Sequence, residues 1–218
     1  MEFGSVITSE DLATAYGSTD ALQGQPQPRS GKFTMWSAKQ VSTLATLNVR
    51  TLYAPGKLSC TLREINRYRC DVLGLAETHW VGEGEITLDG VRVLFSGRED
   101  GVHREGVAIL LNKEAQKAYV EHRPVSSRII SVTLKGQHKN AKIIQVYAPD
   151  SNHDDEGVEQ FYESLSGELE RSKSRDLLYI IGDFNSKVGA DNDGYEDVMG
   201  RFGIGNIERE GREDVGLL

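Results

Sequence analysis

The chain has 218 residues, of which 38% are hydrophobic and 7% aromatic, so it is long enough for one domain with a substantial core. Its 33 acidic and 25 basic residues give a net charge of −8, which argues against a protein held on DNA mainly by counterion release. This charge leaves a nuclease open, because an acidic metal pocket with a local basic rim still attracts phosphate.

Cysteine usage and hydropathy point to a reduced, intracellular protein. The two cysteines, Cys60 and Cys70, have no further metal-ligating partner at a useful spacing. No apolar run is long enough to span a membrane, and the N-terminus lacks the basic-then-apolar pattern of a signal peptide. We therefore expect a nuclear or cytoplasmic location and no membrane partner.

Residues 1–40 are expected to form a disordered polar tail, and the folded domain is expected over 41–218. Within the tail, Gln23–Lys32 is rich in Pro and Gln and follows no helical or strand period. In the remainder, apolar runs predict strands over Val41–Leu47, Val72–Leu75, Val107–Leu111, Ile129–Leu134, Ala141–Val146 and Leu177–Ile181.

Helices and turns complete the pattern of the folded part. Amphipathic spacing predicts helices over Lys57–Tyr68 and Val158–Leu169. The pair Asp89-Gly90 predicts a hairpin over Ile86–Leu94, and Gly136–Asn140 predicts the turn of a second hairpin. Strands interleaved with two helices and joined by hairpins indicate a mixed α/β layered sandwich without a second domain.

Polar side chains of one chemical kind follow four of the predicted strands. They are the amide of Asn48, the carboxylate of Glu77, the phenol of Tyr147, and the Asp183 and Asn185 pair. Ligands gather outside the carboxyl ends of strands in α/β sheets, so four such ends can converge on one site. Hard oxygen ligands at this position are what a Mg²⁺ site for phosphate chemistry requires.

The segments LATLNVRTL, LGLAETHW, VYAPD and IIGDFNSKVG, in this order, resemble the motif set of the endonuclease/exonuclease/phosphatase superfamily. ETHW and VYAPD are most similar to endonuclease domains of RTE-type non-LTR retrotransposons and their domesticated relatives, the craniofacial development protein 2-like sequences. The resemblance covers the chain from about Val41 onward. It implies a four-layer α/β sandwich of the DNase I-like type, here missing its C-terminal strands.

The resemblance also implies roles for the strand-end residues in a Mg²⁺-dependent phosphodiesterase, with Mn²⁺ as a substitute metal. Glu77 would hold the metal with help from Asn48, and Asp183 would orient or deprotonate the attacking water. Asn185 would hold the phosphate or the nucleophile, and Tyr147 would donate to the phosphate or the leaving oxygen. Simpler structural readings stay open: a solvated strand-end acid, asparagines that satisfy turn backbone groups, and a packing tyrosine.

Tyr147 favours DNA as the substrate, because superfamily members that act on inositol phosphates or sphingomyelin usually carry a histidine near this strand end. Asp150 departs from the nuclease pattern, which usually has asparagine there, and would place a carboxylate near the scissile phosphate. The family also ends with a Ser-Asp-His segment that nothing after Asn185 resembles. An uncovered sheet edge and weakened catalysis are therefore expected.

The favoured function is a Mg²⁺-dependent endonuclease of retrotransposon origin that hydrolyses DNA phosphodiester bonds, with activity reduced or lost through truncation. One alternative is a catalytically inactive module that binds nucleic acid or protein. Another is a phosphoesterase that acts on a small phosphorylated substrate, against which Tyr147 argues.

Overall fold

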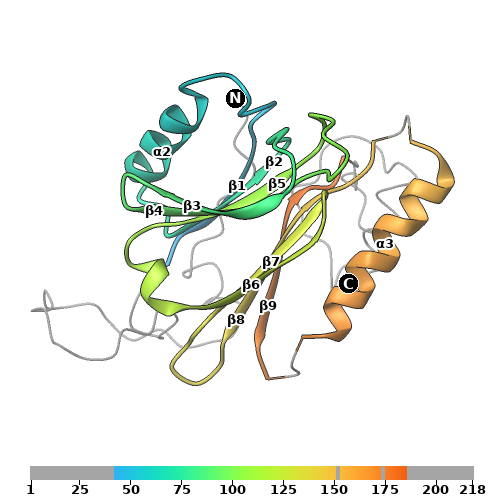
Figure 1. Cartoon of the computed structure of the whole chain (residues 1–218). Coiled ribbons are helices and arrows are strands. Elements are labelled where there is room, and N and C mark those ends of the chain that lie inside the picture. The colour runs from blue at the N-terminus through green and yellow to red at the C-terminus, as the bar shows by residue number, and fades with distance from the viewer. Residues whose placement is uncertain (1–41, 151–152, 173–174, 186–218) are drawn as a thin grey trace, which may run out of the picture.

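The computed structural model describes residues 42–150, 153–172 and 175–185, which form two β-sheets and two longer helices (Figure 1). The tail predicted over 1–40 and the Gly- and Asp-rich segment after Asn185 lie outside the described residues. The uncovered sheet edge expected from missing C-terminal strands therefore stays a prediction. Among the described helices, none combines the length and the apolar character that crossing a membrane would demand.

The first sheet has five strands in the order β1-β2-β5-β4-β3. Its strands are β1 (Leu44–Asn48), β2 (Val72–Ala76), β3 (Glu83–Leu88), β4 (Val91–Ser96) and β5 (Val107–Leu111). Strand β1 pairs with β2 in parallel, and the other neighbours are antiparallel. The β3–β4 turn confirms the predicted hairpin, because Asp89 and Gly90 both have the positive φ that a tight two-residue turn requires.

The second sheet has four strands in the order β6-β7-β8-β9. Its strands are β6 (Tyr119–Ser126), β7 (Ile129–Leu134), β8 (Ala141–Tyr147) and β9 (Leu177–Asp183). Strand β8 pairs with β9 in parallel, whereas β6, β7 and β8 form an antiparallel meander that includes the predicted second hairpin. Strand β6 follows the short 3-10 helix η1 (Ala115–Ala118), and the sequence analysis predicted neither of them.

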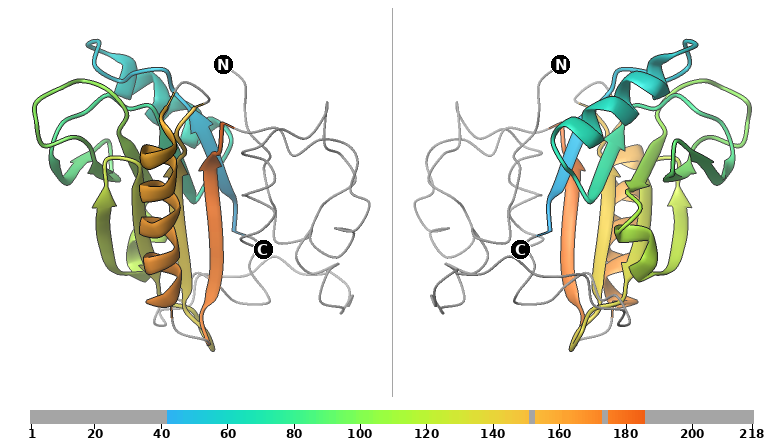
Figure 2. Two further views of the ribbon diagram at one scale, coloured as in Figure 1. Left: turned by 90° about the vertical axis from the view of Figure 1, so that its right-hand side faces the viewer. Right: turned by 90° about the vertical axis from the view of Figure 1, so that its left-hand side faces the viewer.

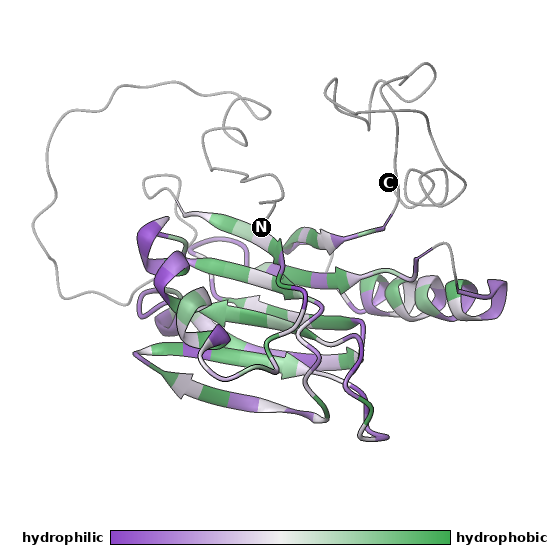
Figure 3. Ribbon diagram, turned by 90° about the horizontal axis from the view of Figure 1, so that it is seen from above, coloured by the Kyte–Doolittle hydropathy of each residue, from purple (hydrophilic) through white to green (hydrophobic). Residues whose placement is uncertain are grey.

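Each sheet carries one helix on its outer face, so the molecule has four layers (Figure 2). Helix α2 (Lys57–Arg67) buries Leu62 and Ile65 against the first sheet. Helix α3 (Asp155–Glu170) buries Phe161 and Leu165 against the second sheet. The hydropathy view shows mostly hydrophobic strands, with hydrophilic residues in the connecting loops and on parts of the helices (Figure 3). This arrangement confirms the predicted sandwich.

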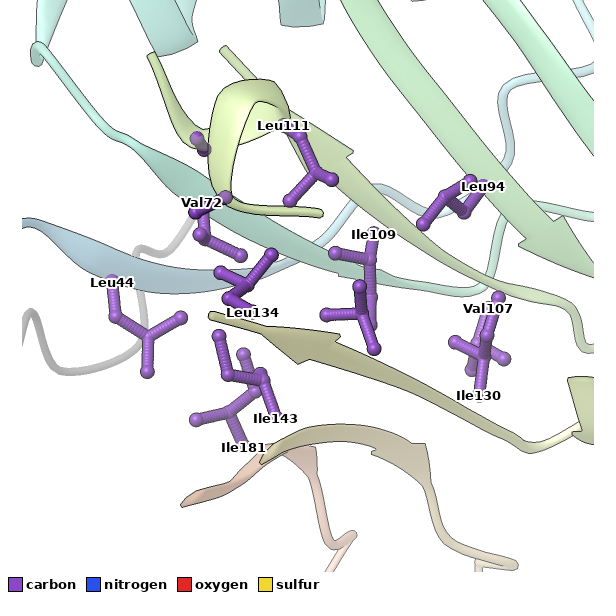
Figure 4. Packing of buried hydrophobic residues seen from close by; sticks show 13 residues of the cluster. Leu44, Val72, Leu94, Val107, Ile109, Leu111, Ile130, Leu134, Ile143 and Ile181 are labelled. Atoms are coloured by element: carbon purple, nitrogen blue, oxygen red, sulfur yellow. The ribbon is translucent and has the colours of Figure 1, made fainter. Parts of the chain in front are cut away.

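The central core lies between the two sheets and consists of aliphatic side chains from both (Figure 4). Side chains alternate between the faces of a strand, so Val107, Ile109 and Leu111 of β5 point into this core while Ala108 and Leu110 face α2. The same alternation decides which side chains of β1, β8 and β9 face the space between the sheets.

One polar side chain, Gln145 of β8, is fully buried between the sheets. Its Oε1 accepts a hydrogen bond from Thr46 Oγ1 at 3.1 Å, and its Nε2 donates to the carbonyl of Val146 at 3.0 Å. Gly74 of β2 makes room for it, because a Cβ at that position would collide with Gln145 Oε1 and lie 2.9 Å from Ile181 Cδ1. These contacts fix how closely the two sheets approach.

Replacing Gly74 with alanine is therefore expected to destabilise the fold by about 1–3 kcal/mol, the usual cost of overpacking a dense core. The matched control is Gly167→Ala in α3, where a Cβ would meet nothing within 4 Å. That substitution should stabilise the protein by about 0.5–1 kcal/mol, because alanine restricts the unfolded chain and favours a helix. Urea unfolding of both variants checks the pair, and a neutral Gly74→Ala would contradict the packing described.

Candidate active site

The polar strand-end residues meet at one end of the space between the sheets. Asn48 lies on the same face of β1 as Thr46, which reaches Gln145 in the other sheet. Tyr147 and Asp183 are register partners at the ends of the parallel strands β8 and β9. Asn48 pairs in register with Ala76, so Glu77 follows directly at the end of β2. Two parallel strand pairs, one from each sheet, thus deliver four functional side chains to one place.

Asn48 connects the two carboxylates of this cluster. Its Nδ2 donates hydrogen bonds to Glu77 Oε1 and to Asp183 Oδ2, each at 2.8 Å. Its Oδ1 accepts from the backbone N–H of Arg50 at 2.9 Å, which fixes which end of the amide faces the acids. The amide therefore holds two negative charges side by side, one from each sheet. The sequence analysis assigned Asn48 to the metal, and the observed contacts add this role of orienting both acids.

Tyr147 completes the cluster from the second sheet. Its hydroxyl donates to Glu77 Oε1 at 2.9 Å. Burial raises the pKa of Tyr147 above its usual value, and the hydrogen bond to Glu77 and the charge of that carboxylate raise it further. Arg128 and Asn185 oppose this rise to a smaller extent. The phenol therefore stays protonated and remains a hydrogen-bond donor throughout the physiological range.

Asn185 lies next to the cluster and is hydrogen-bonded to Asp183. Its backbone N–H donates to Asp183 Oδ1 at 3.0 Å, and its Nδ2 donates to the carbonyl of Ala148 at 2.7 Å. Both oxygens of Asp183 thus have a donor, one from Asn48 and one from Asn185. The structure brings all five predicted residues together, whereas their individual chemical roles stay predictions.

The backbone at Glu77 has an unusual conformation. Its φ is +56°, a left-handed value that costs a non-glycine residue about 1 kcal/mol or more. The neighbouring loops hold it there: Thr51 N–H donates to the Glu77 carbonyl at 2.7 Å, and Thr78 N–H donates to the Gly106 carbonyl at 2.9 Å. Gly106 itself leaves no space for a Cβ, which would collide with Thr78 Oγ1. Two loops therefore clamp the segment that presents the carboxylate.

The donor set suits a hard cation. Within 42–150, 153–172 and 175–185, no group of three or more His, Cys, Asp and Glu side chains is placed to hold a metal. The cluster instead offers the carboxylates of Glu77 and Asp183 with amide groups beside them. Mg²⁺ commonly binds through one or two carboxylates and keeps several waters, whereas structural zinc sites use four nitrogen or sulfur ligands. The residues present therefore fit Mg²⁺.

Arg128 and Glu105 support the site, and the sequence analysis predicted neither. The Nη1 of Arg128 donates to the carbonyls of Tyr147 and Ala148 at 3.2 and 3.3 Å, and its guanidinium lies 5.0 Å from the centre of the Tyr147 ring. The Nη2 of Arg128 donates to Glu105 Oε1 at 3.0 Å, and Ser127 Oγ donates to the other oxygen of Glu105. Both ionic side chains are largely buried. A lone Arg before an apolar run carries no local signal that would reveal these contacts.

Asp150, the departure from the nuclease pattern, is paired with a histidine. His153 Nε2 lies 2.8 Å from Arg128 Nη2, which can only donate, so the proton of the neutral ring lies on Nδ1. That Nδ1 donates to Asp150 Oδ1 at 2.7 Å. Trp80, three residues after Glu77, packs edge-on against Phe95 with 5.1 Å between the ring centres.

Comparison with known proteins gives matches over most of the chain. Residues 45–199 match the model of the endonuclease/exonuclease/phosphatase family. Craniofacial development protein 2 of Tragulus javanicus is 35% identical over 192 residues, which cover 87% of this chain and 33% of that protein. The Bos taurus protein of the same name is 37% identical over 174 residues, which cover 80% of this chain and 29% of that protein. The chain thus spans about a third of the length of these curated relatives.

Among solved structures, the fold is similar to the endonuclease domain of TRAS1, a telomere-specific non-LTR retrotransposon. The TM-score is 0.53 at 15% sequence identity, and the match covers 79% of this chain and 69% of that domain. At this identity the likeness concerns the fold, and it agrees with the DNase I-like sandwich expected from the sequence.

Replacing Tyr147 with phenylalanine tests whether the Tyr147 phenol keeps its proton in the folded protein. Since the folded pKa is raised, the stabilisation from the retained proton is fully present below the unfolded value of about 10 and is lost as the pH rises above it. The variant loses the hydrogen bond to Glu77 and should be about 1–2 kcal/mol less stable at pH 8. It should also lose less stability than the parent between about pH 10 and 11. Urea midpoints measured across this range check the claim, and parallel pH curves would contradict it.

Proposed function

Because the chain belongs to the endonuclease/exonuclease/phosphatase family, we propose that it is a metal-dependent phosphodiesterase that cleaves the DNA backbone at the Asn48, Glu77, Tyr147 and Asp183 cluster. The observation that carries the proposal is the Asn48 amide that joins Glu77 to Asp183 at 2.8 Å on each side. A purely structural pair of strand-end acids would gain more by separating into solvent, because like charges repel.

Glu77 and Asp183 are the side chains that would hold Mg²⁺, or Mn²⁺ in its place. Asn48, the other metal ligand expected from the sequence, turns its Nδ2 towards both acids, while its Oδ1 accepts from the Arg50 N–H. When bound, the cation would supply positive charge to the phosphate oxygens as negative charge develops on them. The remaining chemistry falls to the side chains of this chain.

Asp183 is the proposed acceptor of the proton from the attacking water. Donors on both of its oxygens, Asn48 Nδ2 and the Asn185 N–H, hold the carboxylate in one orientation. A fixed carboxylate needs little reorganisation when it takes up a proton, and such positioning supplies a large part of enzymatic rate enhancement. The amide of Asn48 also brings no additional charge that would repel the phosphate.

Tyr147 is the proposed hydrogen-bond donor to the phosphate or to the leaving oxygen. Its raised pKa supports this role, because a phenol that keeps its proton can donate at any physiological pH. Asn185 is the second residue proposed to hold the phosphate or the nucleophile, and hydrogen bonds to the Ala148 carbonyl and to Tyr147 place its side-chain amide beside the cluster. Arg128 positions both residues through the carbonyls of Tyr147 and Ala148.

DNA is the proposed substrate class on two grounds. The segment Tyr147-Ala148-Pro149 has the tyrosine typical of the nuclease members of the family rather than the histidine of those that act on small phosphate esters. The structural neighbour with a TM-score of 0.53 is itself an endonuclease domain. A catalytically inactive binding module is the outcome that remains if the chain folds but does not cut.

Nicking of supercoiled plasmid tests the proposal directly. The parent chain should nick DNA with Mg²⁺ and not with chelator, while Glu77→Ala and Asp183→Ala should each lower the rate by at least about 100-fold. Glu114→Ala is the matched control, because Glu114 is an exposed acid paired with Lys117 on the surface. Absence of nicking by a chain that unfolds cooperatively in urea would refute catalysis and favour a binding module.

Metal binding can be tested without any turnover. Mg²⁺ that binds only the folded chain should raise the melting temperature progressively, and a concentration 100 times the dissociation constant adds about 2.7 kcal/mol. Glu77→Gln should abolish this response, since glutamine keeps an acceptor for Asn48 and Tyr147 but loses the charge. Glu114→Gln should respond like the parent. An unchanged Mg²⁺ response in Glu77→Gln would place the metal elsewhere.

A further inference from the structure

An exposed aromatic pair, Tyr53 and His103, lies beside the candidate active site. Tyr53 is 66% exposed, more than any other large hydrophobic residue in the described part of the chain. Its ring centre lies 4.3 Å from that of His103, with 53° between the ring planes. The two residues come from different loops, one after β1 and one before β5, so the pairing holds an otherwise free tyrosine ring in place.

Both loops are hydrogen-bonded to the segment that begins with Glu77. On the Tyr53 side, Thr51 N–H donates to the Glu77 carbonyl at 2.7 Å and Leu52 N–H donates to the Thr78 carbonyl at 2.9 Å. On the other side, the Nδ1 of His103 lies 2.9 Å from the carbonyl of His79 and is therefore the protonated nitrogen. The aromatic pair is thus attached to the backbone within two residues of the candidate metal ligand.

The charges around the pair favour an anionic strand. Arg50 and Arg104 are exposed on the same two loops. Two of the three acids of the second loop are in ion pairs, Asp100 with Arg98 and Glu105 with Arg98 and Arg128, whereas Glu99 is exposed. Bonding to Arg98 holds the pKa of Asp100 at about 2, so this carboxylate stays within an ion pair at neutral pH. A phosphate backbone that reaches Glu77 therefore meets basic side chains and an aromatic face here.

We propose that Tyr53, held by His103, is a stacking platform for an unpaired nucleobase next to the phosphate that the cation held by Glu77 and Asp183 would attract. This inference rests on the proposed function, which places that phosphate. A base within a duplex has neighbours on both faces, so only an unpaired or displaced base can offer a face to Tyr53. The preferred substrate is therefore DNA with unpaired nucleotides beside the cleaved bond, and stacking makes the preference independent of base identity.

Binding of a labelled single-stranded oligodeoxynucleotide to the full chain, measured by fluorescence anisotropy with Ca²⁺ in place of Mg²⁺, tests the platform apart from turnover, because Ca²⁺ also takes oxygen ligands, and a gel confirms that the strand stays intact. Tyr53→Ala should weaken binding by about 5- to 150-fold, the range expected for the loss of one stacked base. Tyr53→Phe should bind like the parent, because the ring is retained. Tyr68→Ala is the matched control, since Tyr68 is an exposed tyrosine beyond the far end of α2.

An oligonucleotide of the same length that lacks its bases completes a double-mutant cycle. The effect of Tyr53→Ala should vanish on this strand, and the slope of affinity against salt should be unchanged, because no phosphate contact is removed. An equal loss on both strands, or no loss on either, would overturn the platform, and so would a parent chain that binds no single strand. A positive cycle in a chain that fails to nick plasmid would refute the proposed catalysis while the base contact stands.

Discussion

Two carboxylates from different sheets approach one another at the end of the sandwich, and the amide of Asn48 is what allows them to do so. Glu77 and Asp183 would repel each other if they were left alone, but each accepts one hydrogen of the same Nδ2 at 2.8 Å. This bond requires the ends of β1, β2 and β9 to coincide. The coincidence in turn depends on how the sheets are spaced by Gln145 and Gly74. The polar cluster and the interior packing are therefore parts of one constraint.

The loops around the cluster share that constraint. The Glu77 segment is clamped on one side by the loop after β1 and on the other by the loop before β5, through the carbonyls of Glu77 and Gly106. Arg128 and Glu105 then tie the same loop to the end of β8. A change in either of these two loops, or at the end of β8, therefore reaches the Glu77 segment through hydrogen bonds, which are short and directional. The site is consequently more rigid than its position among loops would suggest.

The parts of the fold that the sequence predicts are those whose signal is local. Strands β2 and β5 are continuous apolar runs, and the β3–β4 turn has the Asp-Gly pair that a tight hairpin requires. Strand β6 was missed because its sequence, YVEHRPVS, is largely polar and contains a proline, and its pairing with β7 is irregular. Helix α3 begins three residues earlier than predicted because the Asp154 side chain caps Gly157 N–H, a contact that hydrophobic periodicity does not register. For the candidate site, the strand-end position of Asp183 could be predicted from the apolar run before it. The hydrogen bonds from Arg128 to the end of β8 could not, because they join segments that are distant in the sequence.

The left-handed backbone of Glu77 has a consequence for substitution at this position. Glycine adopts a φ of +56° without penalty, so the backbone at this position favours glycine, whereas the hydrogen bonds from Asn48 and Tyr147 to the carboxylate favour the acid. A change to glycine would relieve the strain but would leave the donors of Asn48 and Tyr147 without their acceptor. The strained backbone at Glu77 and the polar cluster therefore depend on each other: the cluster holds the carboxylate in a conformation that the backbone alone would not favour.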